Sequence, residues 1–196
     1  MKIIAAYESN RGRDGSGYNI LVWPDSAMIL SHKPLFLPEE EDSIHVGIAA
    51  KIKAVGKSVK PKFAHRYYDA IAPAAFIFSS SVSSKLNRKE DPEATDIVAD
   101  FSVICGDFTD AEGLNEDLKL SLSIKTLSGD ERLSENLEVN NWENLLAEAI
   151  ARATERNTIK TGDTVAVLLP GSFPAERDSL LSIGINGVAL IENKLK

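Results

Sequence analysis

Residues 44–71, IHVGIAAKIKAVGKSVKPKFAHRYYDAI, predict a strand, a glycine turn and a helix, and they decide the fold. The first half alternates as a half-buried strand does. Its apolar face would consist of Ile44, Val46, Ile48, Ala50 and Ile52. Binding or catalytic chemistry would sit on the opposite face, which carries His45, Gly47, Ala49, Lys51 and Lys53. The helix is expected from about Pro61 to Ala70, because proline suits a first helical turn and Pro73 would stop the helix.

This stretch resembles the fumarylacetoacetate hydrolase family, whose sequences read roughly I-H-x-E-x-E-L here, followed by a glycine turn and a helix close to K-F-A-x-x-Y-Y-D-x-I. Ile44, His45, Gly56 and residues 63–71 match that pattern. Gly47 and Ala49 stand where the family has its two glutamates. Two carboxylates at this spacing share one face of a strand, about 6 to 7 Å apart, and can converge on one divalent cation. Glycine and alanine offer a cation no ligand.

The resemblance covers nearly the full length, with a second anchor at residues 159–171. It implies an α+β, mostly β fold, a mixed β-sheet roll with two or three packed helices, as a single domain over residues 1–196. It also implies a homodimer. Active members of the family use magnesium, manganese or calcium to polarise a keto-acid, which they cleave, decarboxylate or isomerise.

Three more positions depart from the family pattern. Trp23 stands where a lysine would pair with a substrate carboxylate, and Ile77 stands where the third metal carboxylate would be. The family's T-G-T, whose hydroxyls face the ligand, is Val167-Leu168-Leu169 here. With all three acidic ligands replaced, the resemblance implies no catalytic residue, no metal and no other cofactor at this place.

The leading hypothesis is therefore a non-catalytic, metal-free relative that binds a small molecule or a protein partner. Its remodelled pocket, either open to an apolar ligand or filled by side chains, would be lined at the family-site positions Trp23, His45, Gly47, Ala49, Ile77 and Leu169. A rival hypothesis is a metal-dependent hydrolase, decarboxylase or isomerase of keto-acids with a displaced site. That site would use His45, Asp25 and an acidic residue of the run 39–42, and it predicts a bound cation or a tight carboxylate cluster near His45. A third hypothesis is a regulatory partner of an active relative.

Composition limits the other classes of function. A net charge of -7 and 43% hydrophobic residues suit a globular protein and argue against a nucleic-acid or membrane surface, which needs a basic patch. No apolar stretch approaches the length of a membrane span. Cys105 is the only cysteine, so no internal disulfide forms and a cytoplasmic location is expected.

Other segments predict ordinary structural elements. Residues 118–124 alternate as a half-buried strand, and a helix capped by Asn140 should bury Leu146, Ala149, Ile150 and Ala153. Asn186-Gly187 is the favoured turn of a closing hairpin. The serines between 79 and 84 lack a sequence-paired histidine and are interpreted as polar turn or strand-edge residues rather than nucleophiles.

Overall fold

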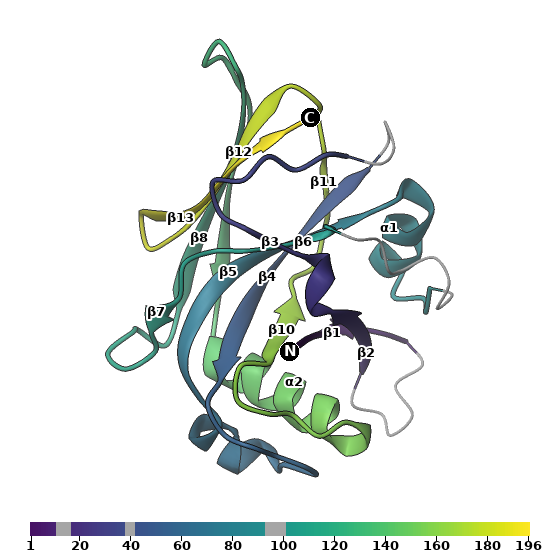
Figure 1. Ribbon diagram of the computed structural model, residues 1–196, viewed down its shortest axis with the longest axis vertical. Coiled ribbons are helices and arrows are strands. Elements are labelled where there is room, and N and C mark those ends of the chain that lie inside the picture. The colour runs from purple at the N-terminus through teal and green to yellow at the C-terminus, as the bar shows by residue number, and fades with distance from the viewer. Residues whose placement is uncertain (11–16, 38–41, 93–100) are drawn as a thin grey trace.

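The computed structural model describes residues 1–10, 17–37, 42–92 and 101–196 (Figure 1). The charged residues Arg11 and Arg13 and most of the acidic run, residues 39–41, lie outside these ranges. The strands are β1 (Lys2–Glu8), β2 (Tyr18–Pro24), β3 (Met28–Leu30), β4 (Ser43–Ile52), β5 (Tyr68–Phe78), β6 (Val103–Cys105), β7 (Thr109–Asp110), β8 (Leu118–Thr126), β9 (Glu131–Val139), β10 (Thr164–Leu168), β11 (Phe173–Pro174), β12 (Ser179–Ile185) and β13 (Val188–Leu195). The helices are α1 (Ser80–Asn87), α2 (Trp142–Arg156) and the 3-10 helices η1 (Asp25–Ala27) and η2 (Pro61–Arg66).

Most strands belong to one curled, mixed sheet with the order β2-β1-β10-β4-β5-β6-β3. The pairs β1–β10 and β3–β6 are parallel, and the other pairs along this path are antiparallel. A second, antiparallel sheet has the order β13-β12-β8-β9 and occupies the upper left of Figure 1. The mostly β mixed-sheet fold that the sequence predicts is therefore confirmed.

Strand β4 separates two apolar cores, because its side chains alternate between the two faces of the large sheet. The larger core contains the predicted apolar face, Ile44, Val46, Ile48, Ala50 and Ile52, together with inward residues of the second sheet and of α2. The smaller core lies on the opposite face and contains Ala49, Trp23, Phe76 and Phe78. The face on which the sequence placed the candidate site is thus itself a core.

Helix α2 closes the larger core from below β10 and β1 in Figure 1. Its predicted apolar stripe is confirmed, since the side chains Leu146, Ala149, Ile150 and Ala153 are fully buried. The helix begins one residue later than predicted, after Asn141, whose φ of 55° is left-handed and whose side chain makes no capping bond. Trp142 anchors this end by donating its indole N–H to the carbonyl of Asn115 at 2.8 Å.

Two predicted elements differ from the structure. The helix expected over 61–70 is only the 3-10 helix η2, and residues from Tyr68 onward form β5. The serines at 80, 81, 83 and 84 lie in helix α1 rather than in a turn or at a strand edge. Among the helices in the described ranges, none has the length and apolar character that a membrane crossing requires.

Candidate functional site

Gly47 lies in β4, where its backbone is paired on both sides, with Leu168 of β10 and Ala74 of β5. A Cβ atom at this position would lie 2.5 Å from the carbonyl oxygen of Val167 and 3.5 Å from Cε2 of Phe76. Real Cβ atoms do not approach backbone oxygen so closely, so any side chain at residue 47 requires the paired strands to move apart. The backbone of β10 therefore leaves no room for a side chain at the position where the resemblance expects a glutamate.

Aromatic rings fill the rest of this face. Trp23 packs against Phe76 and Phe78, with ring centroids 5.3 and 6.0 Å apart, and only 1% of Trp23 is exposed. Ala49 is fully buried in the same core. Trp23, Gly47 and Ala49 are therefore brought together, but as a packed aromatic core.

Ile77 does not join these residues. It pairs with Ile44 across β4 and β5 and belongs to the larger core, on the opposite face of the sheet. The reason is the two-residue period of a strand, which sends Phe76 and Phe78 to one face and Ile77 to the other. Ile77 therefore lies apart from the other residues that the sequence predicts for the pocket.

The residues at these positions do not fit the divalent cation that the family resemblance implies. Such cations take oxygen ligands, chiefly carboxylates. In the part of the chain that the structure describes, no group of three His, Cys, Asp or Glu side chains is arranged to hold a metal. Of the residues in the rival hypothesis, Asp25 is exposed at the start of η1 and Asp42 is buried.

A cavity of about 420 Å³ lies next to the filled face. Its walls come from the ends of β1, β9 and β10, the C-terminal end of α1, the first turns of α2 and residues 169–171. Of the six predicted pocket residues, His45 and Leu169 line this cavity, whereas Trp23, Gly47, Ala49 and Ile77 do not.

His45 is 3% exposed and is held between the cavity and helix α1. Its Nε2 lies 2.9 Å from Oγ of Ser83, and its ring stands edge-on to Phe78 with centroids 5.3 Å apart. Burial lowers the pKa of His45 to about 4, because an imidazolium would lose its hydration there. His45 is therefore neutral at physiological pH.

Sequence reasoning missed Ser83, the hydrogen-bond partner of His45. The two residues lie 38 positions apart on different elements, so no local pattern joins them. A weak signal existed, since Val82 and Leu86 are both buried and their spacing of four residues is that of one helix face. Had this spacing been used, it would have predicted helix α1, although not its contact with His45.

Charged groups at the cavity rim pair with each other. Lys89 Nζ lies 2.7 Å from Oε1 of Glu8. Close by, Oδ1 of Asp91 accepts hydrogen bonds from Tyr7, Ser9 and Asn19 at 2.8, 2.8 and 3.1 Å. Burial, with the Asp91 contact adding to it, raises the pKa of the Tyr7 phenol. These contacts tie the chain after α1 to β1 and β2.

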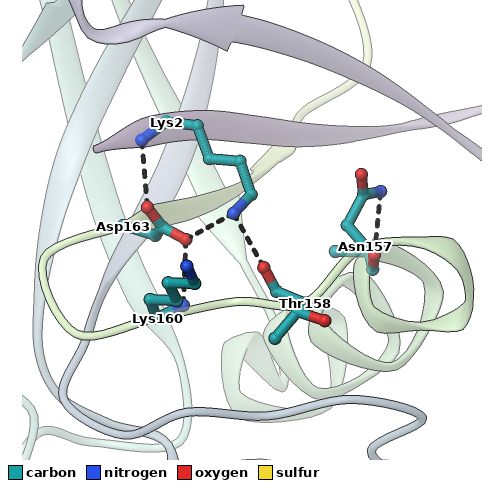
Figure 2. Close-up of polar contacts among 6 residues, drawn as sticks. Lys2, Asn157, Thr158, Lys160 and Asp163 are labelled. Carbon is teal, nitrogen blue, oxygen red and sulfur yellow. Dashed lines mark hydrogen bonds and ion pairs between the residues drawn. The ribbon is translucent and has the colours of Figure 1, made fainter.

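The Gly162-Asp163 part of the second sequence anchor is a structural clamp rather than a binding site (Figure 2). Oδ1 of Asp163 accepts the backbone N–H of Lys2 at 3.0 Å. Oδ2 accepts hydrogen bonds from Lys2 Nζ at 2.7 Å and from the backbone N–H of Lys160 at 2.9 Å. Lys2 Nζ also donates to the carbonyl of Thr158 at 2.7 Å. The clamp joins the start of β1 to the turn that precedes β10.

No protein-family model matches the chain, and no curated protein does. Solved structures do resemble it. A Yersinia pestis protein assigned to the fumarylacetoacetate hydrolase family superposes with a TM-score of 0.76 and 16% identity, over 100% of this chain and 92% of that one. The 5-carboxymethyl-2-hydroxymuconate delta-isomerase of Mycobacterium smegmatis superposes with a TM-score of 0.73 and 17% identity, over 99% of this chain and 76% of that one.

A fumarylpyruvate hydrolase from Pseudomonas aeruginosa, solved with Mn²⁺ and pyruvate, gives a TM-score of 0.71 and 16% identity, over 100% of this chain and 89% of that one. These matches span almost the whole chain and include both sheets. At such low sequence identity these matches show the fold alone, because one fold can carry many different sites. The chain has the fold of the fumarylacetoacetate hydrolase family.

Proposed function

We propose that this protein is a non-catalytic, metal-free relative of the fumarylacetoacetate hydrolases that binds a small molecule in the cavity beside His45 and Leu169. The observation that carries the proposal is the separation of two places. The Val167 carbonyl oxygen leaves no room for a side chain at residue 47, while an open cavity of about 420 Å³ lies beside His45 and Leu169. A cavity of this size falls within the range of small-molecule sites.

The crowding at Gly47 argues against recovery of the family's metal chemistry. A cation would supply polarisation of a carbonyl oxygen, worth several kcal/mol of transition-state stabilisation. The positions that would hold it offer a hydrogen atom at Gly47 and a methyl group at Ala49. Mn²⁺ and pyruvate belong to the Pseudomonas enzyme, and we expect neither to bind here in the same way.

The walls of the cavity favour a ligand with an apolar body and few polar groups. Leu86, Leu145 and Leu169 contribute aliphatic surface, and Tyr18 adds an aromatic ring. His45 is a buried polar side chain among the lining residues, and the buried hydroxyl of Tyr7 is already bound to Asp91. Apolar walls with a few placed polar groups are the usual make-up of ligand pockets.

The test combines metal analysis with a ligand screen. Elemental analysis and calorimetric titration with Mg²⁺, Mn²⁺ and Ca²⁺ should find no stoichiometric metal and no binding heat. A fragment library is then screened by ligand-observed NMR in the presence of EDTA. We expect hits that bind the wild type and are lost in Leu169→Trp, which fills the cavity.

Leu127→Trp is the matched control, because Leu127 is 59% exposed at the turn between β8 and β9 and does not line the cavity. It should keep every hit. One tightly held cation per chain would overturn the metal-free part of the proposal. Hits that survive Leu169→Trp, or an empty screen, would overturn the cavity as the binding site.

A further inference from the structure

The two ring nitrogens of His45 face different surroundings. Nε2 points toward Ser83, which does not line the cavity, whereas His45 itself does. Within the described ranges, the one sealed side-chain nitrogen or oxygen that lacks a hydrogen-bond partner is Oδ1 of Asn193. Among the residues that the structure describes, none makes a hydrogen bond to Nδ1 of His45, and this nitrogen is not among the sealed atoms without a partner. Since His45 lines the cavity and Nε2 is engaged by Ser83, we infer that Nδ1 is the ring nitrogen available to a ligand there.

The Ser83 hydroxyl determines which nitrogen carries the hydrogen. A neutral imidazole has one N–H donor and one bare acceptor nitrogen, and a hydroxyl has a single hydrogen to donate. The contact with His45 is the hydrogen bond of the Ser83 side chain, and Ser83 is only 3% exposed. If Nε2 held the hydrogen, the buried hydroxyl hydrogen would have no acceptor there, which is costly. We therefore expect Ser83 to donate to Nε2, which places the ring hydrogen on Nδ1.

We propose that His45 recognises the cavity ligand by donating Nδ1–H to an uncharged oxygen acceptor, such as a ketone, ester or amide carbonyl, with Ser83 as the positioning residue that fixes this tautomer. The proposal rests on the proposed function and names its ligand class. An uncharged oxygen is favoured over a carboxylate because Glu8 and Glu138 also line the cavity, and the Lys89 ammonium is paired with Glu8. The lowered pKa of His45 agrees with a neutral ring.

The tautomer is tested in the free protein by long-range ¹H–¹⁵N NMR of the uniformly labelled chain at pH 7. The sequence has three histidines, and His45→Gln identifies the signals of His45. We expect the Nδ1–H pattern for His45 in the wild type. Ser83→Ala should shift it toward the Nε2–H form that free histidine prefers, and Ser83→Thr should restore it.

Ser81→Ala is the control, because Ser81 is exposed on the same helix and does not contact His45. It should leave the pattern unchanged. An Nε2–H pattern in the wild type, or an unchanged pattern in Ser83→Ala, would overturn the role of Ser83. This experiment needs no ligand, so its failure is distinct from failure of the fragment screen.

The ligand class is tested with two probes of matched shape, acetophenone and ethylbenzene, which differ in one carbonyl oxygen. Acetophenone should shift the Nδ1–H signal of His45, and ethylbenzene should not. Ethylbenzene should also bind about fivefold to tenfold more weakly, the ratio that one neutral hydrogen bond supplies. Equal affinities, or no His45 shift with acetophenone, would overturn the assignment of the ligand class while fragment binding elsewhere in the cavity could still stand.

Discussion

At the scale of single residues, Gly47 limits which side chains its position in β4 can accept. We predict that Gly47→Ala lowers the free energy of unfolding by about 1 to 3 kcal/mol, the usual cost of overpacking. The physical reason is the Val167 carbonyl oxygen, 2.5 Å from the new Cβ, in a strand held on both sides. Urea denaturation of both proteins measures the change. Gly47→Glu should lower the free energy of unfolding further and should not bind Mn²⁺. A stable Gly47→Glu variant that binds Mn²⁺ would show that the metal site can still form at this position.

The Asp163 clamp makes a prediction about pH. Burial alone would raise the pKa of Asp163, but hydrogen bonds from Lys2 and Lys160 and the charge of Lys2 outweigh burial and hold the pKa below its usual value. A carboxyl with a lowered native pKa stabilises the fold above its unfolded pKa of about 3.9, and this contribution is lost as the pH falls through the native pKa.

Asp163→Asn should therefore lower the free energy of unfolding by about 1.5 to 3 kcal/mol at pH 7, the range for hydrogen bonds to a charged group. The difference from the wild type should shrink as the pH is lowered below about 4. Urea denaturation at pH 7 and pH 3 measures this difference in the free energy of unfolding. A double-mutant cycle with Lys2→Met, alone and combined with Asp163→Asn, isolates the free energy of interaction between the two side chains. An equal difference at both pH values would mean that the Asp163 charge contributes nothing.

At the scale of elements, the sequence predicts best where periodicity and burial agree. Strand β4, helix α2 and the hairpin of β12 and β13 were all predicted, because each has one apolar face and a clear turn or stop signal. The helix over 61–70 was wrong beyond Arg66. Its aromatic spacing imitated a helix, yet residues after Tyr67 continue into the apolar run of β5, which pairs with β4 along its length. Pairing between strands overrides local propensity, and one sequence alone does not reveal it.

The residues that the sequence predicts for the candidate site lie in different places in the structure. His45 and Leu169 line the cavity, whereas Trp23 and Ala49 are packed in the smaller core. Ile77 lies in the larger core, because neighbouring residues of a strand face opposite sides of the sheet. Ser83 was missed because its contact with His45 is tertiary.

The turn of the last hairpin gives a prediction for an element. Asn186 and Gly187 have φ values of 50° and 85°, the left-handed pair that a two-residue turn of this type requires. Gly187→Ala should lower the free energy of unfolding by about 1 kcal/mol, because a Cβ disfavours this backbone region. The neighbouring Val188→Ala, at a side chain 60% exposed, is the control and should change little. Equal stability of both variants by thermal denaturation would contradict the argument.

At the scale of the whole molecule, we propose that the chain forms a homodimer, as its resemblance to the family implies. Several large apolar side chains are exposed on the single chain, including Leu30, Phe36 and Phe101 at 64%, 68% and 59%. Light scattering after size exclusion should give twice the chain mass of 21.3 kDa. Phe36→Asp is expected to weaken association if this side chain lies in the interface, and a monomer at all concentrations would reject the dimer.

A ligand should raise the thermal stability of the whole molecule, whereas a divalent metal should leave it unchanged. A ligand that binds only the folded state stabilises it by about 2.7 kcal/mol at a hundredfold excess over its Kd. For a chain of this size, that corresponds to a rise in Tm of about 5 to 11 °C. A fragment hit should produce this rise in the wild type and in Leu127→Trp, but not in Leu169→Trp, where the cavity is filled. Mn²⁺, Mg²⁺, Ca²⁺ and EDTA should leave the Tm of all three proteins unchanged, because Gly47 and Ala49 offer no ligand atoms to a cation. A rise with Mn²⁺ that EDTA reverses would instead require a metal site built from other residues, and its persistence in Leu169→Trp would place that site outside the cavity.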